Sequence, residues 1–191
     1  MVARQWGRMV VGGMVLAGLA ACGSTKSEEE RLYLFEQLEQ ERFREDVGWD
    51  TLRQYLPAFP SAKTSWIEVG TVNTQTPFRH FIDAGSVAIA PGQIVRYTLK
   101  SESDRGAVNI SYESIRCGVA VWKTVAIGGT DAWEQARNDE WRSIERGGVQ
   151  DTLRRGVMCS GGGVASTKES QLLYRLKNWE NYNLQTANEN G

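Results

Sequence analysis

The sequence predicts an α+β domain in which an antiparallel sheet of about five strands carries helices packed on one face. Short runs of alternating apolar and polar residues follow one another from about residue 65 to about residue 128, and tight-turn sequences separate them. Stretches in which apolar residues recur at helical spacing come after the last of these runs. Short strands joined by tight turns pair as an antiparallel meander, and the later helices must bury their apolar faces against it.

The chain begins with the pattern of an exported leader. Two arginines precede an apolar, glycine-containing run from Met9 to Leu19, which is too short to span a bilayer. Leu19-Ala20-Ala21-Cys22 closes the run and resembles a bacterial lipobox, in which the cysteine is acylated and the upstream residues are removed. We therefore expect a lipoprotein signal peptide over residues 1–21 and palmitate or a similar acyl chain on Cys22. Gly23 is not the aspartate associated with inner-membrane retention, so we expect an anchor in the cell outer membrane, facing the periplasm.

Composition limits the classes of partner. About 170 residues remain after cleavage, which is enough for one domain with a hydrophobic core. Loss of the two leader arginines changes the net charge from −1 to about −3. A chain with no basic excess cannot neutralise many phosphates, which argues against nucleic acid as a partner.

Of the three cysteines, Cys22 lies in the lipobox-like sequence and the other two lie in the main domain. If Cys22 is acylated, Cys117 and Cys159 remain as an even pair in an oxidising compartment. We predict a disulfide between them, because free thiols are uncommon outside the cytosol. The alternative is two separate buried thiols.

Residues 22–48 indicate a polar tether followed by a charged helix. The stretch from Glu28 to Asp46 is rich in glutamate, and Ser27 with Glu30 forms a capping-box pattern. This helix could be a stalk or coiled-coil face for a partner, or it could lie on its own domain. We favour the second interpretation, because its apolar stripe is shorter than the three or four heptads that a coiled coil needs.

The main domain is expected over residues 49–160. A proline-bounded connector, Leu56–Pro60, precedes the first strand. The apolar positions of the two cleanest alternating runs are predicted to share one buried face: Val95, Tyr97, Leu99, Val108, Ile110 and Tyr112.

The second of these runs has a phase problem near its end. Its alternation places Arg116 on the core face and Cys117 on the opposite face. Either a bulge near Glu113-Ser114 resets the phase, or a helix covers the second face as well and brings Cys117 to Cys159 there.

The remainder of the chain contains the helical patterns. A short helix is expected after Asp131, an extended segment at residues 141–144 and a helix from Asp151 to Cys159. Residues 161–180 are expected to form a glycine linker and a C-terminal amphipathic helix with its own capping box. The polar residues 181–191 are expected to be a disordered tail.

Several of these segments together carry a family resemblance. They are Leu56-Pro57-Ala58-Phe59-Pro60, Phe81-Ile82-Asp83, Val95–Leu99, Asn109–Cys117, Trp133–Arg137 and Trp141. In this order they resemble the CNP-one-like family of small exported bacterial proteins of unknown function, over roughly residues 49–160. Cys159 resembles the cysteine that closes the helix of that family. The resemblance implies the extent of the domain and supplies no catalytic residue, cofactor or ligand.

No residue pattern marks a catalytic centre or a metal site. His80 is the only histidine, which excludes a histidine-rich metal site, and no motif places a serine beside His80 and Asp83. Glu113 and Asp83 are the acids in the strand region that could act as a hydrolytic pair, although solvated positions are the simpler interpretation. We therefore expect no cofactor and no enzyme activity.

The aromatic and arginine residues near one end of the sheet are the better lead. The candidate partner surface consists of Arg96, Arg116, Trp133, Trp141 and Arg142. Tryptophan with arginine is typical of binding surfaces, whereas the alternative is core tryptophans with arginines lying along them. We interpret the protein as a lipid-anchored, non-catalytic binding or accessory module for an envelope protein, peptide or glycan. The competing hypothesis is a weak carboxylate-dependent glycan hydrolase, which two clustered acids in a cleft would favour.

Overall fold

The computed structural model describes residues 27, 30–34, 37, 49–71 and 77–182. The predicted signal peptide, the lipid site at Cys22, most of the charged segment 22–48 and most of the predicted tail lie outside these residues. Residues 30–34 and 37 are helical, and the Glu30 backbone N–H donates to Ser27 Oγ at 3.2 Å. No helix among the described residues has the length and apolar character needed to cross a membrane.

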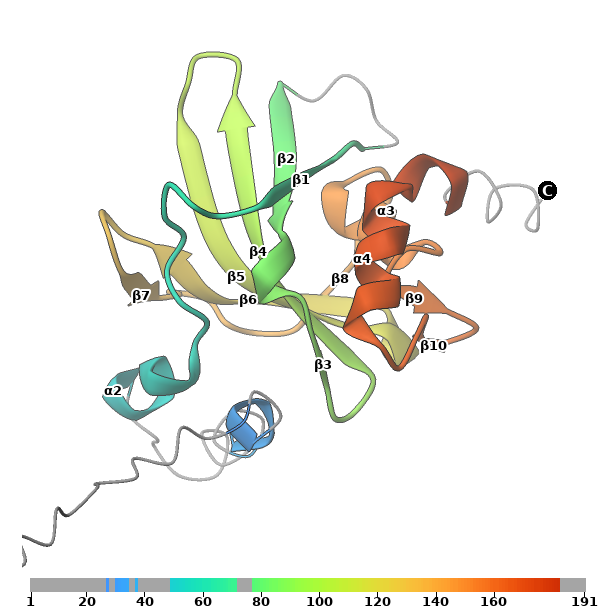
Figure 1. The fold of residues 1–191 in the computed structure, drawn as a ribbon, viewed down its shortest axis with the longest axis horizontal. Helices are drawn as coiled ribbons and strands as arrows, with labels where there is room; N and C mark the ends of the chain where they lie inside the picture. Colours follow the sequence, from blue (N-terminus) through green and yellow to red (C-terminus); the bar gives the residue numbers. More distant parts are fainter. Residues whose placement is uncertain (1–26, 28–29, 35–36, 38–48, 72–76, 183–191) are drawn as a thin grey trace, which may run out of the picture.

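Within the described residues, eight strands form one antiparallel sheet (Figure 1). Its main path runs β1-β2-β4-β5-β6-β7, while β3 pairs with β4 and β8 pairs with β6. These strands are β1 (Trp66–Val69), β2 (Phe78–Asp83), β3 (Ala88–Ala90), β4 (Ile94–Ser103), β5 (Val108–Arg116), β6 (Val121–Gly128), β7 (Trp133–Gln135) and β8 (Arg142–Ser143). A separate hairpin consists of β9 (Cys159–Ser160) and β10 (Gly163–Val164).

Besides the helical residues 30–34, 37 and 179–182, the described chain contains the following helices and 3-10 turns. They are α2 (Trp49–Leu52), α3 (Val149–Arg154), α4 (Glu169–Lys177), η1 (Arg53–Tyr55), η2 (Ala84–Ser86) and η3 (Cys117–Val119). Figure 1 shows α3 and α4 together on one side of the sheet, with α2 at a distance from both. The α+β class is therefore confirmed.

The predicted number of strands was too low, because several strands are too short to show alternation. β7 occupies the place where a short helix was expected after Asp131, and it forms by pairing with the last residues of β6. β8 contains only two residues and pairs with the other end of β6. Pairing with a long neighbouring strand, which local sequence does not reveal, decides the conformation of such segments.

The pairing of β4 with β5 corrects the predicted shared face. Tyr97 lies opposite Glu113, and Thr98 lies opposite Tyr112. Residues that lie directly opposite each other project from the same face of a sheet. The valine, tyrosine and leucine of β4 therefore occupy one face, and Tyr112 occupies the other together with Val108 and Ile110. An offset of one residue in the connecting loop is enough to move the apolar residues of β5 to the other face, because side chains alternate along each strand.

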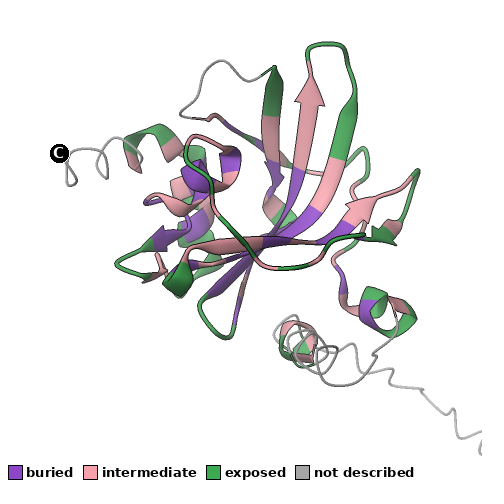
Figure 2. Ribbon diagram, turned by 180° about the vertical axis from the view of Figure 1, so that it is seen from behind, coloured by how far each residue is buried: buried purple, intermediate pink, exposed green. Residues whose placement is uncertain are grey.

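Both faces of the sheet are covered. On the first face, the principal core joins β4 to α3 and α4, and Leu153, Leu172 and Leu176 are completely buried there. On the second face, Leu52 and Leu56 from the α2–η1 segment join Tyr112, Val125 and Ala126 in a smaller second core. Helices therefore pack on both faces, where the sequence predicted one. Figure 2 shows that burial in β4 and β5 is greatest in the halves away from the β4–β5 turn and falls toward that turn.

Coverage of both faces also resolves the phase problem in β5. The β5–β6 register does shift between Tyr112 and Glu113, but the additional residue, Val125, belongs to β6. β5 therefore keeps its own alternation, and Cys117 follows it onto the first face beside Ile115. Of the two alternatives, the one in which helices cover both faces is therefore correct. Cys117 reaches Cys159 on the first face, which α3 and α4 cover.

A disulfide joins Cys117 to Cys159, with 5.5 Å between their Cα atoms. The predicted pairing is confirmed, although the predicted helix over residues 151–159 was too long. α3 ends at Arg154, and Gly156 adopts a positive φ of 72° before the chain enters β9. A glycine in this left-handed conformation is typical of the residues that follow a helix.

The glycines expected as a linker belong to a tight hairpin instead, in which Gly161 and Gly162 form the turn and Gly163 begins β10. Gly161 and Gly162 adopt φ values of 57° and 79° between β9 and β10. The amphipathic helix that follows is present as α4, but its N-cap is Lys168 without a side-chain cap. Ser166 Oγ accepts a hydrogen bond from the Lys168 backbone N–H, so the serine stabilises the turn before the helix.

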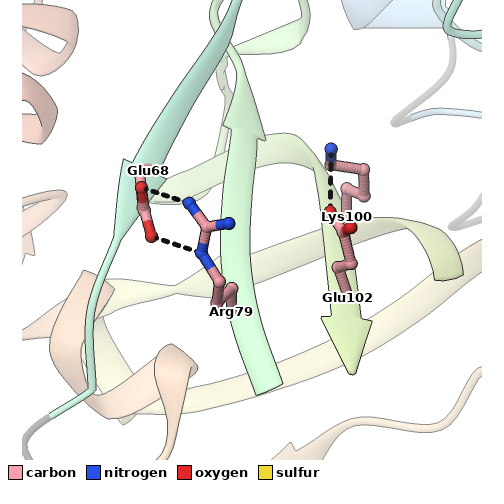
Figure 3. A network of polar contacts seen from close by, with 4 residues as sticks. All are labelled: Glu68, Arg79, Lys100 and Glu102. Atoms are coloured by element: carbon pink, nitrogen blue, oxygen red, sulfur yellow. Dashed lines mark hydrogen bonds and ion pairs between the residues drawn. The ribbon is translucent and has the colours of Figure 1, made fainter. Parts of the chain in front are cut away.

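The outer part of the second face, away from α2, carries charged side chains (Figure 3). Arg79 donates two hydrogen bonds of 3.0 Å to the carboxylate of Glu68, and Lys100 lies 3.5 Å from Glu102. The Lys100 ammonium also lies 4.2 Å from the centroid of the Phe81 ring. Exposed pairs of this kind contribute little to stability, but charge near a sheet edge discourages pairing with another chain.

Candidate functional site: a polar cleft on the first face

A cleft of about 440 Å³ opens on the first face of the sheet, beside the start of α3. Its floor comes from β2, β4 and β5, and its wall comes from the loop that leads into α3. Its polar lining includes His80, Ser101, Asn109, Ser111, Glu113 and Gln150.

Strand register brings the floor residues together. His80 of β2 lies opposite Ser101 of β4, and Ser101 lies opposite Asn109 of β5. Ser111 and Glu113 follow on the same face of β5, because side chains alternate along a strand. The same face of β4 is apolar at Tyr97 and Leu99 and becomes polar only at Ser101, where the principal core gives way to the cleft.

Glu113 is the buried acid of the cleft, with 4% of its surface exposed. Its carboxyl group accepts hydrogen bonds from the Tyr97 hydroxyl at 2.9 Å, from Ser111 Oγ at 2.8 Å and from Gln150 Nε2 at 3.0 Å. Burial raises the pKa of Glu113, while these hydrogen bonds and the charge of Arg142 act in the opposite direction. Burial and the neighbouring Glu113 also raise the pKa of Tyr97 well above its ordinary value, so the phenol remains a donor.

His80 is the second titratable group of the cleft. Its Nδ1 lies 3.0 Å from Ser101 Oγ, and burial lowers its pKa, which favours the neutral imidazole. Asp83 does not join it, because residues three apart on a strand project from opposite faces. Asp83 instead accepts a hydrogen bond of 2.9 Å from the Gly85 backbone N–H at the start of η2. The structure therefore brings neither His80 nor Glu113 together with Asp83, and the hypothetical hydrolytic pair is wrong.

A smaller pocket of about 280 Å³ adjoins the cleft and shares Arg146, Gly148 and Gln150 with it. Trp122 and Arg142 form its far side, together with Ser143 and Glu145. Among the described residues, no group of three or more histidine, cysteine or acidic side chains is placed to hold a metal ion.

The five residues of the predicted partner surface do not form one surface. Arg142 lines the smaller pocket, on the first face. Arg116 lies on the second face, where its guanidinium is 4.6 Å from the Trp141 ring centroid and Lys123 approaches the same ring at 4.9 Å. These residues lie near one end of the sheet, as predicted, but the alternation of β5 and β6 separates them onto two faces.

Arg96 and Trp133 contradict the predicted surface more directly. Arg96 is completely buried, in the part of β4 where β3 pairs with it on one side and β5 on the other, with Ala88 and Ser114 as its strand partners. Trp133 packs against the second core, where its ring lies 5.1 Å from the ring of Phe59 and its indole N–H donates to a backbone carbonyl at 2.9 Å. The alternative prediction, that the tryptophans belong to the core, is therefore correct for Trp133.

Sequence reasoning missed most of the cleft. Ser101 carried a weak signal, because it is a polar residue at the next position on the face of Val95, Tyr97 and Leu99. Asn109 carried none, because it lies opposite the apolar face of its own alternating run. Arg146 and Gln150 carried none, because they come from a loop and a short helix that only the tertiary fold places against β5.

The model of the CNP1-like family matches residues 44–177. The chain belongs to the CNP1-like family. It is 30% identical over 162 residues to Cryptic neisserial protein 1 of Neisseria gonorrhoeae, an alignment that covers 71% of this chain and 78% of that protein. No solved structure matches the chain. The CNP1-like region includes the whole cleft, the disulfide and α4, so the cleft lies within the part that defines the family.

Proposed function

We propose that the chain is a lipid-anchored cell-envelope protein whose CNP1-like domain binds a hydroxyl-rich ligand, such as an envelope glycan, in the cleft without catalysing a reaction. The observation that carries this proposal is the convergence of hydrogen-bonding side chains from three strands and the α3 loop on one concave site. Convergent polar groups in a cleft are typical of ligand sites. The lipobox at Cys22 and a disulfide suited to an oxidising compartment support the location.

The chemistry of the lining suits hydroxyl groups. Serine and histidine side chains can each donate and accept, and the amides of Asn109 and Gln150 offer both kinds of group. Ser111 already donates its proton to Glu113, so its oxygen can accept a hydrogen bond from a ligand. A ligand rich in hydroxyls can satisfy all of these groups.

A carboxylate-dependent hydrolase is the second candidate, because a buried carboxyl with a raised pKa can act as a general acid. Glycoside hydrolysis uses two carboxyl groups that flank the scissile bond. Asp83 cannot supply the second, since it lies on the other face. The carboxyl of Glu113 is also held by three donors, which favours a fixed binding group over a mobile acid.

The cleft can be tested with two neighbouring residues of β5 that project from opposite faces. Asn109 lines the cleft, whereas Val108 is half-exposed on the second face. Purified wild type, Asn109→Ala and Val108→Ala would be equilibrated with soluble envelope glycans, and retained species would be identified by mass spectrometry. We expect Asn109→Ala to lose most of the retained glycan and Val108→Ala to keep it. Equal retention by all three proteins would contradict the binding site.

The anchor has a separate test. Cys22→Ala should release the protein into the soluble fraction or leave the leader uncleaved. Recovery of wild-type protein with no lipid on its mature N-terminus would contradict the anchor and would not affect the cleft.

A further inference from the structure

The smaller pocket contains an arginine that the fold holds in place. Arg142 of β8 lies opposite Trp122 of β6, and its guanidinium is 4.3 Å from the centroid of the Trp122 ring. The same guanidinium donates a hydrogen bond of 3.3 Å to Thr124 Oγ1. Stacking and this single bond fix the plane of the group and leave most of its five N–H donors available. An arginine fixed in this way loses little side-chain entropy when it binds an anion.

A second arginine completes the pocket. Arg146 belongs both to this pocket and to the wall of the cleft. Within residues 49–71 and 77–182, neither Arg142 nor Arg146 forms an ion pair. Glu145 is the acid in the lining, and Ser143 and Gln150 are neutral, so the lining carries a net positive charge.

We propose that the pocket between Arg142 and Arg146 binds an anionic group, a carboxylate or a phosphate, of the ligand whose hydroxyl-rich part lies in the cleft. This inference rests on the proposed function and extends it to an acidic glycan. Its basis is geometric: the two spaces share Arg146, Gly148 and Gln150, so one ligand can occupy both. Guanidinium groups bind carboxylates and phosphates through two parallel N–H donors, and such charge-assisted bonds are the stronger ones.

The remaining charge near the pocket is compatible with an anion. Glu113 is the acid of the cleft floor, and it accepts hydrogen bonds from Tyr97, Ser111 and Gln150. These three donors and the charge of Arg142 already act on its carboxyl group, which reduces its repulsion of an anionic ligand in the neighbouring pocket.

The test uses the purified full-length lipoprotein in detergent and follows the indole N–H signal of Trp122 by NMR. Inorganic phosphate, D-glucuronate and neutral D-glucose are titrated in separate samples. We expect a saturable shift of the Trp122 signal with phosphate or glucuronate and none with glucose. Stronger binding of glucuronate than of phosphate identifies a carboxylated sugar, and the reverse identifies a phosphorylated ligand.

Variants then assign the binding to the two arginines. Arg142→Gln and Arg146→Gln should each lower the affinity for the anion by about tenfold or more. A loss of this size corresponds to one charge-assisted hydrogen bond. Arg105→Gln, an exposed arginine in the β4–β5 turn, should bind like the wild type. Arg142→Lys should restore only part of the affinity, because lysine keeps the charge but lacks the planar fork. Melting temperatures of all variants would be measured to confirm that they fold.

Two outcomes would overturn the proposal: a shift that does not saturate with either anion, or unchanged affinity in both glutamine variants. The failure of this inference can be distinguished from failure of the proposed function. If Asn109→Ala abolishes glycan retention while Arg142→Gln and Arg146→Gln retain it, the cleft stands and the anion pocket is wrong.

Discussion

Breaking the Cys117–Cys159 disulfide should remove much of the stability of the domain. The two cysteines are separated by 42 residues in the sequence, and the chain-entropy model gives about 4 kcal/mol for a loop of this length. Both residues are buried in the principal core, so their replacement also removes packing contacts. We therefore expect Cys117→Ala to lower the free energy of unfolding by about 4 kcal/mol. Cys159→Ala and the double variant should give similar losses, because any of the three changes opens the same loop.

Urea denaturation followed by circular dichroism measures this loss. With a slope of about 2 kcal/mol per molar urea, the midpoint should fall by about 2 M. Cys22→Ala is the matched control, because it removes a cysteine and leaves the disulfide intact. Wild type under reducing conditions should behave like the double variant. A loss below about 1 kcal/mol with an unchanged slope would refute the argument that loop closure stabilises this fold.

Three further predictions concern the cleft and the two faces of the sheet. Burial raises the pKa of Glu113 in the folded state, so the stability that its neutral acid contributes is present at low pH and lost as the pH rises through that pKa. Glu113→Gln should therefore gain stability relative to wild type as the pH increases in urea titrations, and parallel pH profiles would contradict this. Trp133→Ala should cost about 3 kcal/mol, because it removes a ring from the second core, and should leave glycan retention unchanged. Lost retention with an unchanged melting temperature would instead place Trp133 in a binding surface. Gly128→Ala would place a Cβ 2.9 Å from Cβ of Ile110 and should cost about 1–3 kcal/mol. Gly85→Ala, whose nearest contact would be 3.5 Å away, should cost less, and equal melting temperatures for the two alanine variants would show that the contact at Gly128 relaxes.

The sequence by itself determined the features that depend on local pattern and on cysteine chemistry. Alternation identified β4 and β5 as strands, because half-buried strands place apolar residues at every second position. Helical spacing identified α4, whose Leu172 and Leu176 are completely buried. The disulfide between Cys117 and Cys159 was predicted because the leader indicates export to an oxidising compartment, where free thiols are uncommon. The ordered motifs were sufficient to identify the family.

Only the tertiary structure decided which side chains share a face and which meet. The loop between β4 and β5 sets their register, and a change of one residue moves every β5 side chain to the other face. Arg96 was predicted as a surface residue, but it is completely buried in the folded chain, on a strand that β3 and β5 flank on both sides. The cleft forms because α3 and the loop that leads into it, both distant in sequence from β5, line its wall, and Gln150 of α3 donates a hydrogen bond to Glu113. Contacts between distant segments leave no periodic signal in either segment, and for this reason the candidate site became visible only in the folded chain.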